Sequence, residues 1–255
     1  MKIRELYERL NETIPPSLSC EWDNDGRMVC PDGEKEVRKV LVTLDVTEGA
    51  VDHAVEGGFD LIVSHHPLIF KGLKNLGGED YLSEKVIRLL RSGIAVFSFH
   101  TRLDAVEGGV NDVLAHRLGL EEVRAFANGE ETIGRIGKLP VPMSAKDFAL
   151  RVKEALGAPV VQFSDAGIPV RRVAVLGGGG EDDLAAARAA GADTYVTGEL
   201  KYHTLTDGPE TGTNLVEAGH FWTEFPICEN LCHRLREIAP SLECEIYFSN
   251  TVQTV

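Results

Sequence analysis

The sequence predicts an α/β protein made of two copies of one βαβ plan. Apolar runs rich in β-branched residues end in Gly, Asp or Ser and alternate with helical patterns about ten residues long, which is typical of βαβ units. A gapless overlay at an offset of 133 residues places Val40 on Val173 and Asp60 on Asp193. An upstream helical pattern also recurs, as "IRELYERL" and "KDFALRVKEAL". A chain of 255 residues suits one large α/β unit or two intertwined halves.

The first repeat is expected over residues 1–120. It opens with an amphipathic, charged helix in "MKIRELYERLNE". Strands are predicted at 37–45, 59–64 and 94–99, because these runs are apolar and β-branched. Helices are predicted between and after them, at 47–56, 82–91 and 109–118. This order is that of a parallel sheet with helical crossovers.

The second repeat is expected over residues 144–255, after a loop-rich connection at 121–143. Ser144 with Asp147 forms a plausible capping box for the helix that opens this half. Strand patterns follow at 158–163, 171–178, 192–198, 214–220 and 244–250, with helices at 181–190 and 222–238. The Gly-rich run "VLGGGGEDDL" lacks the Lys and hydroxyl of a phosphate loop, and we interpret it as a tight turn.

Charge and composition limit the functions to consider. The formal net charge of −14 repels a phosphate backbone, which makes nucleic acid an unlikely partner. No apolar run approaches the roughly 20 residues of a membrane helix, and the N-terminal stretch does not resemble a signal peptide. An odd count of five cysteines favours reduced thiols. We therefore expect a soluble, cytoplasmic protein.

Histidines and carboxylates follow the ends of the predicted strands. His65 and His66 end "DLIVSHH", His100 and Asp104 lie in "FHTRLDA", and "GHFWTE" brings His220 and Glu224. Because ligands in open α/β sheets gather at the carboxyl ends of strands, we expect a site that draws on both halves. His220 and Glu224 are four residues apart and so share one helix face.

This set predicts a centre with two divalent metal ions. Dications at the roughly 3.5–4 Å spacing of such centres need anionic oxygens between them, which a carboxylate supplies and an imidazole does not. Asp104 and Glu224 are therefore the expected bridges, and His65, His66 and His220 the terminal ligands. Nitrogen and oxygen donors suit zinc, manganese, iron or cobalt, and a water between the ions would be an activated hydroxide.

Other polar residues near these positions are open to two interpretations. His100, Glu199, Tyr202 and His203 line the expected cleft as substrate-binding or ligand-orienting groups, or have a purely structural role. His53, His116 and His233 are interpreted as ordinary histidines.

The motifs "WDNDG", "DLIVSHHPLIF", "FSFHTRLDAVEGGVND", "YVTGELKYH" and "GHFWTEF" resemble those of the Nif-three-like proteins, often named type-2 homologues of GTP cyclohydrolase I. The resemblance covers nearly the whole chain. It implies two intertwined, duplicated α/β repeats with mixed, mostly parallel sheets, a dinuclear metal centre and a toroidal homohexamer. Carried over motif by motif, its metal ligands are the same five residues: His65, His66, Asp104, His220 and Glu224.

Three functions remain open at this point. The first is a metal-dependent hydrolase acting on a small, nucleotide-like substrate, for which the resemblance implies GTP ring opening. The second is a hexameric metal-binding scaffold or regulatory binding protein without catalysis. The third is single-stranded nucleic-acid binding, which the net charge disfavours.

Overall fold

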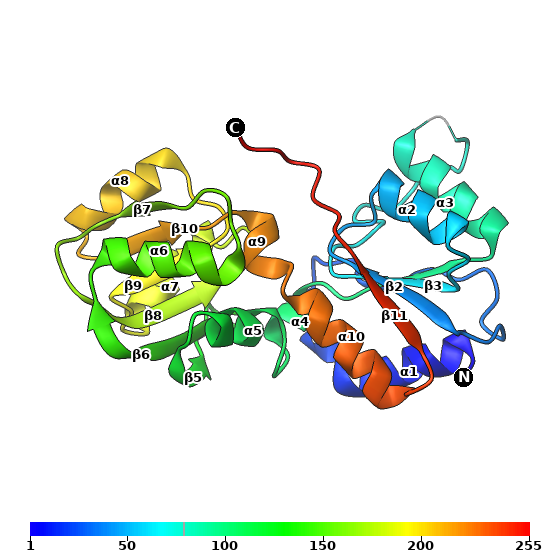
Figure 1. The fold of residues 1–255 in the computed structure, drawn as a ribbon, viewed down its shortest axis with the longest axis horizontal. Helices are drawn as coiled ribbons and strands as arrows, with labels where there is room; N and C mark the ends of the chain where they lie inside the picture. Colours follow the sequence, from blue (N-terminus) through cyan, green and yellow to red (C-terminus); the bar gives the residue numbers. More distant parts are fainter. Residues whose placement is uncertain (79) are drawn as a thin grey trace. The chain divides into compact units, whose positions relative to one another are not determined.

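The computed structural model describes residues 1–78 and 80–255. The described residues divide into two compact units. Unit 1 contains residues 1–106 and 228–251, and unit 2 contains residues 107–227 and 252–255. These boundaries differ from the sequence-based division at 120 and 144, because the C-terminal helix and strand return to the N-terminal unit (Figure 1).

The sheet of unit 1 is mostly parallel. Its strand order is β1-β4-β3-β2-β11. The strands are β1 (Gly26–Val29), β2 (Lys39–Thr43), β3 (Leu61–Ser64), β4 (Ala95–Ser98) and β11 (Glu243–Tyr247). β1 is antiparallel to β4, whereas β4, β3, β2 and β11 run parallel. The sheet is therefore mixed, as the family resemblance implied.

Helices cover both faces of this sheet, which explains why its central strands are apolar along their whole length. Leu41, Ile62 and Val96 pack with residues of α2 (Glu48–Glu56) and α3 (Tyr81–Ser92). The opposite face is covered by α1 (Ile3–Thr13) and α10 (Ile227–Ile238), as Figure 1 shows. Asp80 caps α3 by accepting hydrogen bonds from the amides of Leu82 and Ser83.

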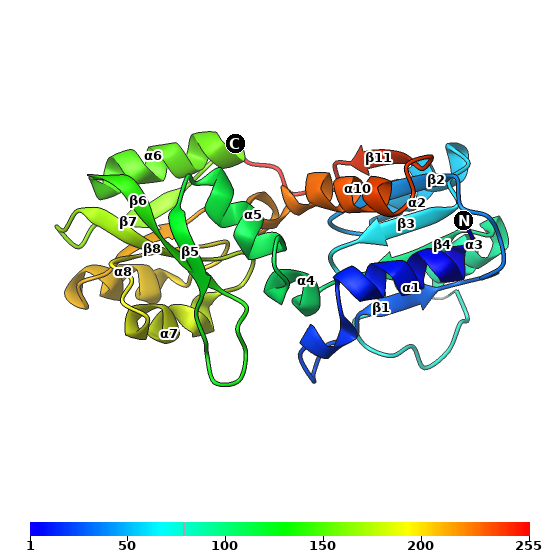
Figure 2. The same cartoon turned by 90° about the horizontal axis from the view of Figure 1, so that it is seen from below.

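Unit 2 repeats this arrangement. Its strand order is β5-β6-β8-β9-β10-β7. The strands are β5 (Glu121–Ala125), β6 (Arg135–Met143), β7 (Gln162–Ser164), β8 (Val170–Leu176), β9 (Thr194–Thr197) and β10 (Asn214–Glu217). Alternate residues of β8 face opposite ways. Val173 and Val175 pack with α5 (Val110–Arg117) and α6 (Ala145–Leu156), whereas Ala174 and Leu176 pack with α7 (Leu184–Ala189) and α8 (Tyr202–Glu210) (Figure 2).

The predicted duplication is visible in the strand register. Val40 pairs with Leu61 and Val173 with Thr194, so both pairings are related by the same offset of 133 residues. The two aspartates that the overlay matched also act alike. The Asp60 carboxylate accepts from the amides of residues 38 and 39, and the Asp193 carboxylate accepts from those of residues 171 and 172. In each unit an antiparallel edge strand, β1 or β7, pairs with the third parallel strand.

The expectation of a loop-rich connection at 121–143 was wrong. This stretch forms β5 and β6, which pair with each other and extend the sheet beyond β8. Proline cannot donate to a strand ladder and so masked the pattern. Pro140 and Pro142 lie where the register between β6 and β8 shifts, between Lys138 and Met143, so the ladder is interrupted there.

The stretch 222–238, which was expected to form one helix, belongs to two helices in the structure. The structure has a short helix α9 (His220–Glu224) followed by α10. It also contains short segments that no strong pattern marks: η1 (Pro16–Leu18), α4 (Thr101–Ala105) and η2 (Glu181–Asp183). Ser144 caps α6 by accepting from the Asp147 amide, as predicted. Across residues 1–78 and 80–255, no helix combines the length and apolar character needed to cross a membrane.

Candidate metal centre

In unit 1 the candidate ligands follow two adjacent parallel strands. His65 and His66 come directly after β3, and His100 follows β4 and precedes α4, which carries Asp104. The two strand ends are held in register, because Ser64 pairs with Ser98 and the Phe99 amide donates to the Ser64 carbonyl. Parallel strands thus deliver these side chains to one edge of the sheet.

His65 is fully buried and its ring orientation is defined by the backbone. Its Nδ1 lies 2.9 Å from the carbonyl oxygen of Phe99. Because a carbonyl only accepts, Nδ1 carries the proton, and the lone pair is on Nε2. Nε2 lies 3.6 Å from Oδ1 of Asp104. The nitrogen that is able to bind a metal therefore faces a carboxylate.

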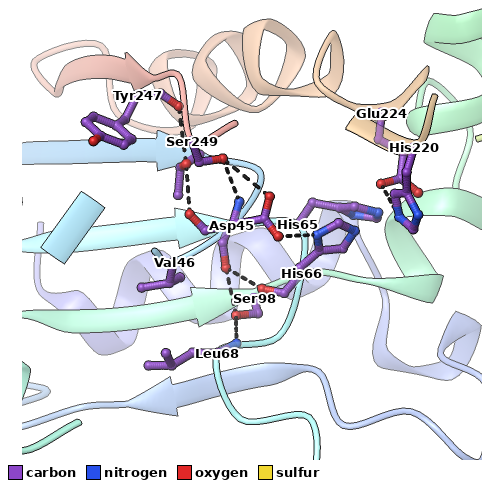
Figure 3. A network of polar contacts seen from close by, with 12 residues as sticks. Asp45, Val46, His65, His66, Leu68, Ser98, His220, Glu224, Tyr247 and Ser249 are labelled. Carbon is purple, nitrogen blue, oxygen red and sulfur yellow. Dashed lines mark hydrogen bonds and ion pairs between the residues drawn. The ribbon is translucent and has the colours of Figure 1, made fainter. Parts of the chain in front are cut away.

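His66 is oriented by a carboxylate. Its Nδ1 lies 2.7 Å from Oδ1 of Asp45, which follows β2 (Figure 3). Asp45 is in turn held by the C-terminal segment of unit 1. The hydroxyl of Ser249 accepts from the Asp45 amide at 3.1 Å and contacts its Oδ2 at 3.4 Å (Figure 3). A carboxylate on Nδ1 fixes the tautomer and raises the basicity of Nε2, as is usual for metal-binding histidines.

His100 belongs to the same cluster. Its Nδ1 lies 2.9 Å from Oδ1 of Asp23, whose side chain is fully buried. Burial acts to raise the pKa of Asp23, but hydrogen bonds from His100 and Thr101 outweigh it and lower the pKa to about 2. His65, His66 and His100 each offer a ring nitrogen within 4.8 Å of the others.

The "WDNDG" loop secures the start of α4. Asp23 accepts from both the amide and the hydroxyl of Thr101. Asp25 accepts from the His100 amide and from Nε of Arg102 at 3.0 Å. Arg102 is 1% exposed, and its guanidinium also donates to Asn11 and to the Ile14 carbonyl. This network holds the helix turn that carries Asp104.

Unit 2 carries its own pair of candidate ligands on α9. His220 Nε2 lies 3.1 Å from Oε2 of Glu224, one helical turn away (Figure 3). His220 Nδ1 lies 3.0 Å from Oε1 of Glu199, which follows β9. Glu224 is 5% exposed, so its carboxylate is largely shielded from water.

A glycine turn accommodates this carboxylate. Gly178 has φ +68°, and a Cβ there would lie 2.2 Å from Oε1 of Glu224 and 3.0 Å from Nε2 of His220. The Gly178 amide donates to the hydroxyl of Thr223, and its carbonyl accepts from the amides of residues 198 and 199. The Gly-rich run that we interpreted as a tight turn therefore leaves space for Glu224.

The residues fit a divalent metal ion. Each of the four histidines His65, His66, His100 and His220 has Nδ1 within hydrogen-bond distance of an oxygen acceptor. Asp104 lies near Nε2 of His65, and Glu224 near Nε2 of His220. Imidazole nitrogen with carboxylate oxygen is the donor set expected for zinc, manganese, iron or cobalt.

Two of the residues with two open interpretations are not among the potential metal ligands. Tyr202 and His203 are exposed on α8, and neither belongs to the groups of potential metal ligands found among the described residues. Asp45 and Asp23 were not among the predicted site residues. Asp45 ends the run "VLVTLD" and Asp23 lies within "WDNDG", so both stood in recognised patterns, but only their distant partners reveal their roles.

Comparison with known proteins agrees with this fold. A relative from Clostridium perfringens (strain 13 / Type A), named "GTP cyclohydrolase 1 type 2 homolog", is 32% identical over 242 residues, 93% of this chain and 92% of the relative. A relative of the same name from Clostridium acetobutylicum is 33% identical over 232 residues, 89% of this chain and 86% of the relative. The crystal structure of a Staphylococcus aureus hypothetical protein superposes with a TM-score of 0.91 at 27% identity, covering 100% of this chain and 99% of that one. The family model for Duf34/NIF3 (NGG1p interacting factor 3) matches residues 1–254, and the chain belongs to this family, as its motifs predicted.

Proposed function

We propose that the ligand sets of the two units bind two divalent metal ions per chain, and that the protein is a metal-dependent hydrolase acting on a small nucleotide-like substrate. The observation that carries the proposal is the shared orientation of the histidines. In His65, His66 and His220, Nδ1 is within hydrogen-bond distance of an oxygen, which is the orientation in which metal-binding histidines usually present Nε2 to the ion.

The number of candidate ligands supports the proposed number of ions. His65, His66 and Asp104 are three side chains on unit 1, and His220 and Glu224 are two on unit 2. A zinc ion in a catalytic site takes three protein ligands and an open position. Five ligands, two of them carboxylates with two oxygens each, would suffice for two ions and would leave positions for water or substrate.

The protein residues have distinct tasks in this proposal. Asp104 and Glu224 supply the negative charge that offsets repulsion between two dications. Asp45, Glu199 and the Phe99 carbonyl hold the imidazoles in one orientation. If bound there, two dications would supply Lewis acidity and would lower the pKa of a water toward neutrality. The name of the relatives makes GTP the first substrate to test.

Metal content is the first test. We expect about two ions per chain in the wild type after dialysis, about one in His65→Ala and about none in Glu224→Gln, because a bridge serves both ions and a terminal imidazole one. His116→Ala is the matched control, since His116 is exposed on α5. A wild-type chain that binds no metal would remove the proposal.

Hydrolysis is the second test. The metal-loaded protein is incubated with GTP, other nucleotides and phosphoesters, and products are followed by chromatography. Turnover that Glu224→Gln abolishes and His116→Ala preserves is the expected result. Two bound ions with no turnover of any substrate would instead favour the metal-binding scaffold without catalysis.

On the family resemblance alone, we further propose a toroidal homohexamer. One chain has a mass of 27.8 kDa. Light scattering at micromolar concentration is expected to give about six times that mass. A mass near that of one chain would remove this part of the proposal.

A further inference from the structure

Two large aromatic side chains of unit 1 are exposed in loops close to the candidate ligands. Trp22, in the "WDNDG" loop, is 59% exposed, and Phe70, in the segment after β3, is 47% exposed. Tryptophan is usually well buried, so its exposure at this position calls for an explanation.

The two rings and His100 contact one another, and we name these three residues the aromatic triad. The ring centroids of Trp22 and Phe70 are 6.3 Å apart, those of Trp22 and His100 6.1 Å, and those of Phe70 and His100 6.2 Å. The interplanar angles of 66°, 80° and 90° are edge-to-face contacts. The rings thus support one another while much of their surface stays accessible.

The aromatic triad is continuous with the candidate metal ligands. The His100 ring centroid lies 5.3 Å from that of His65 and 5.8 Å from that of His66. All of these residues belong to unit 1. A molecule held at the exposed rings would therefore lie beside the ligand set of that unit.

The triad is also held in place before any ligand arrives. Buried Asp23 contacts the His100 ring, and the side-chain amide of Asn24 donates to the carbonyl of Ile69. These bonds tie the loop of Trp22 to the strand end that carries His100 and to the segment of Phe70. A surface ordered in advance loses less entropy when it binds.

We infer that Trp22 and Phe70 form a stacking surface for a flat heteroaromatic ring of the substrate, with His100 linking this surface to the metal ligands. The inference rests on the proposed function, because it assumes that the substrate binds at the ligand set of unit 1. It adds the chemical class of the part of the substrate that the protein recognises: a planar ring, such as a nucleobase.

A small planar ring suits this surface better than a protein partner does. The exposed area of the two side chains is on the order of 250 Å², given the size of aromatic residues. A specific protein interface needs roughly 800 Å² from each partner. The net charge of −14 repels anionic substrates from the chain, and stacking provides an attraction that does not depend on charge.

The test compares two probes that differ in the ring. Guanosine 5′-monophosphate carries a purine, and ribose 5-phosphate has the same phosphate and sugar without it. Their dissociation constants are measured by calorimetry on the full chain, with manganese and after metal removal. We expect the wild type to bind the purine probe at least about tenfold more tightly, the size typical of base stacking on an aromatic side chain.

Substitutions of Trp22 and Phe70 test whether their rings cause the preference for the purine probe. Trp22→Leu or Phe70→Leu is expected to reduce the preference to about twofold, whereas Trp22→Phe keeps most of it because a ring remains. Tyr81→Leu is the matched control, since Tyr81 is 78% exposed on α3. Metal content is measured in each variant to verify that the ligand set is intact.

Three results would overturn the inference: equal affinity of the wild type for both probes, an unchanged preference in Trp22→Leu and Phe70→Leu, or an equal loss in Tyr81→Leu. A Trp22→Leu variant that loses self-association but retains the ring preference would identify the surface as a contact between copies instead. The preference for the purine probe is also measured without metal. A result against the stacking surface can therefore be distinguished from a result in which the chain does not bind metal or does not hydrolyse GTP.

Discussion

Replacement of Gly178 by Ala tests whether the glycine turn exists to make space for the Glu224 carboxylate. Gly178 has φ +68°, where an added Cβ is strained by the backbone itself. The same Cβ would lie 2.2 Å from Oε1 of Glu224. The substitution therefore combines a conformational cost with a steric conflict at a candidate metal ligand.

A second glycine separates these two effects. Gly157, at the C-terminal end of α6, has φ +66°, and among the described residues nothing lies within 4 Å of a Cβ placed there. Both variants are expected to lose about 1–2 kcal/mol of unfolding free energy, the cost of the left-handed conformation for an L-residue. Only Gly178→Ala also has to move the carboxylate oxygen, by about 1 Å to reach an ordinary contact.

Metal affinity is where the variants should differ. Metal sites tolerate deviations of about 0.2 Å in ligand distance, so a shift of about 1 Å in Glu224 is severe. We expect Gly178→Ala to bind manganese or zinc at least 10- to 100-fold more weakly, and Gly157→Ala to bind like the wild type. Titration calorimetry measures the metal affinity. Urea unfolding of the metal-free proteins measures the loss of unfolding free energy that both variants are expected to show.

The comparison has a clear refuting result. If Gly178→Ala retains wild-type metal affinity while losing the same stability as Gly157→Ala, the turn has a conformational role alone and Glu224 does not bind metal in the position seen here. A stability loss in Gly178→Ala that metal addition restores fully would refute the reasoning in the same way, since metal stabilises only the chain that binds it.

Three further predictions concern residues that orient the ligands. Asp45→Asn should weaken metal binding about 10- to 100-fold, because the neutral amide no longer supports the His66 imidazole; Ser249→Ala should have a smaller effect, and unchanged affinity in Asp45→Asn would contradict this role. The pKa of Asp23 is lowered from 3.8 to about 2 in the folded chain, so its stabilising contribution is complete above pH 4 and is lost as the pH falls toward 2. Urea unfolding from pH 6 to pH 2.5 should therefore show a shallower acid loss in Asp23→Asn, by about 2 kcal/mol, than in the wild type. Arg102→Met should leave Asp25 buried without its cation and lower the unfolding free energy by about 3–5 kcal/mol, which Asp25→Asn in the same chain should partly restore.

Much of the fold follows from local patterns. The central strands β2, β3, β8 and β9 are apolar runs whose length and bounding residues are readable along the chain, because a sheet covered on both faces needs apolar residues throughout. The internal repeat could also be recognised in the sequence, because equivalent residues serve the same local purpose in both halves. Asp60 and Asp193 recur at the same offset because each accepts hydrogen bonds from the amides at the start of the neighbouring strand.

The candidate ligands could also be predicted from the sequence. They follow predicted strand ends, and such positions place polar side chains at one edge of a parallel sheet. His65 and His66 are adjacent in the chain, and His220 and Glu224 are separated by one helical turn, so the spacing itself indicated each pair.

What orients those ligands depended on the tertiary structure. Asp45 is held by Ser249, which is 204 residues away, and Asp23 contacts His100 across 77 residues. Hydrogen bonds between distant segments leave no periodic signal in either segment. β6 escaped detection because its prolines stand where pairing is interrupted, which becomes apparent once the partner strand is in place. The residue types that follow the strand ends could thus be predicted from local patterns, whereas the direction of each imidazole nitrogen depends on contacts that form when distant segments pack together.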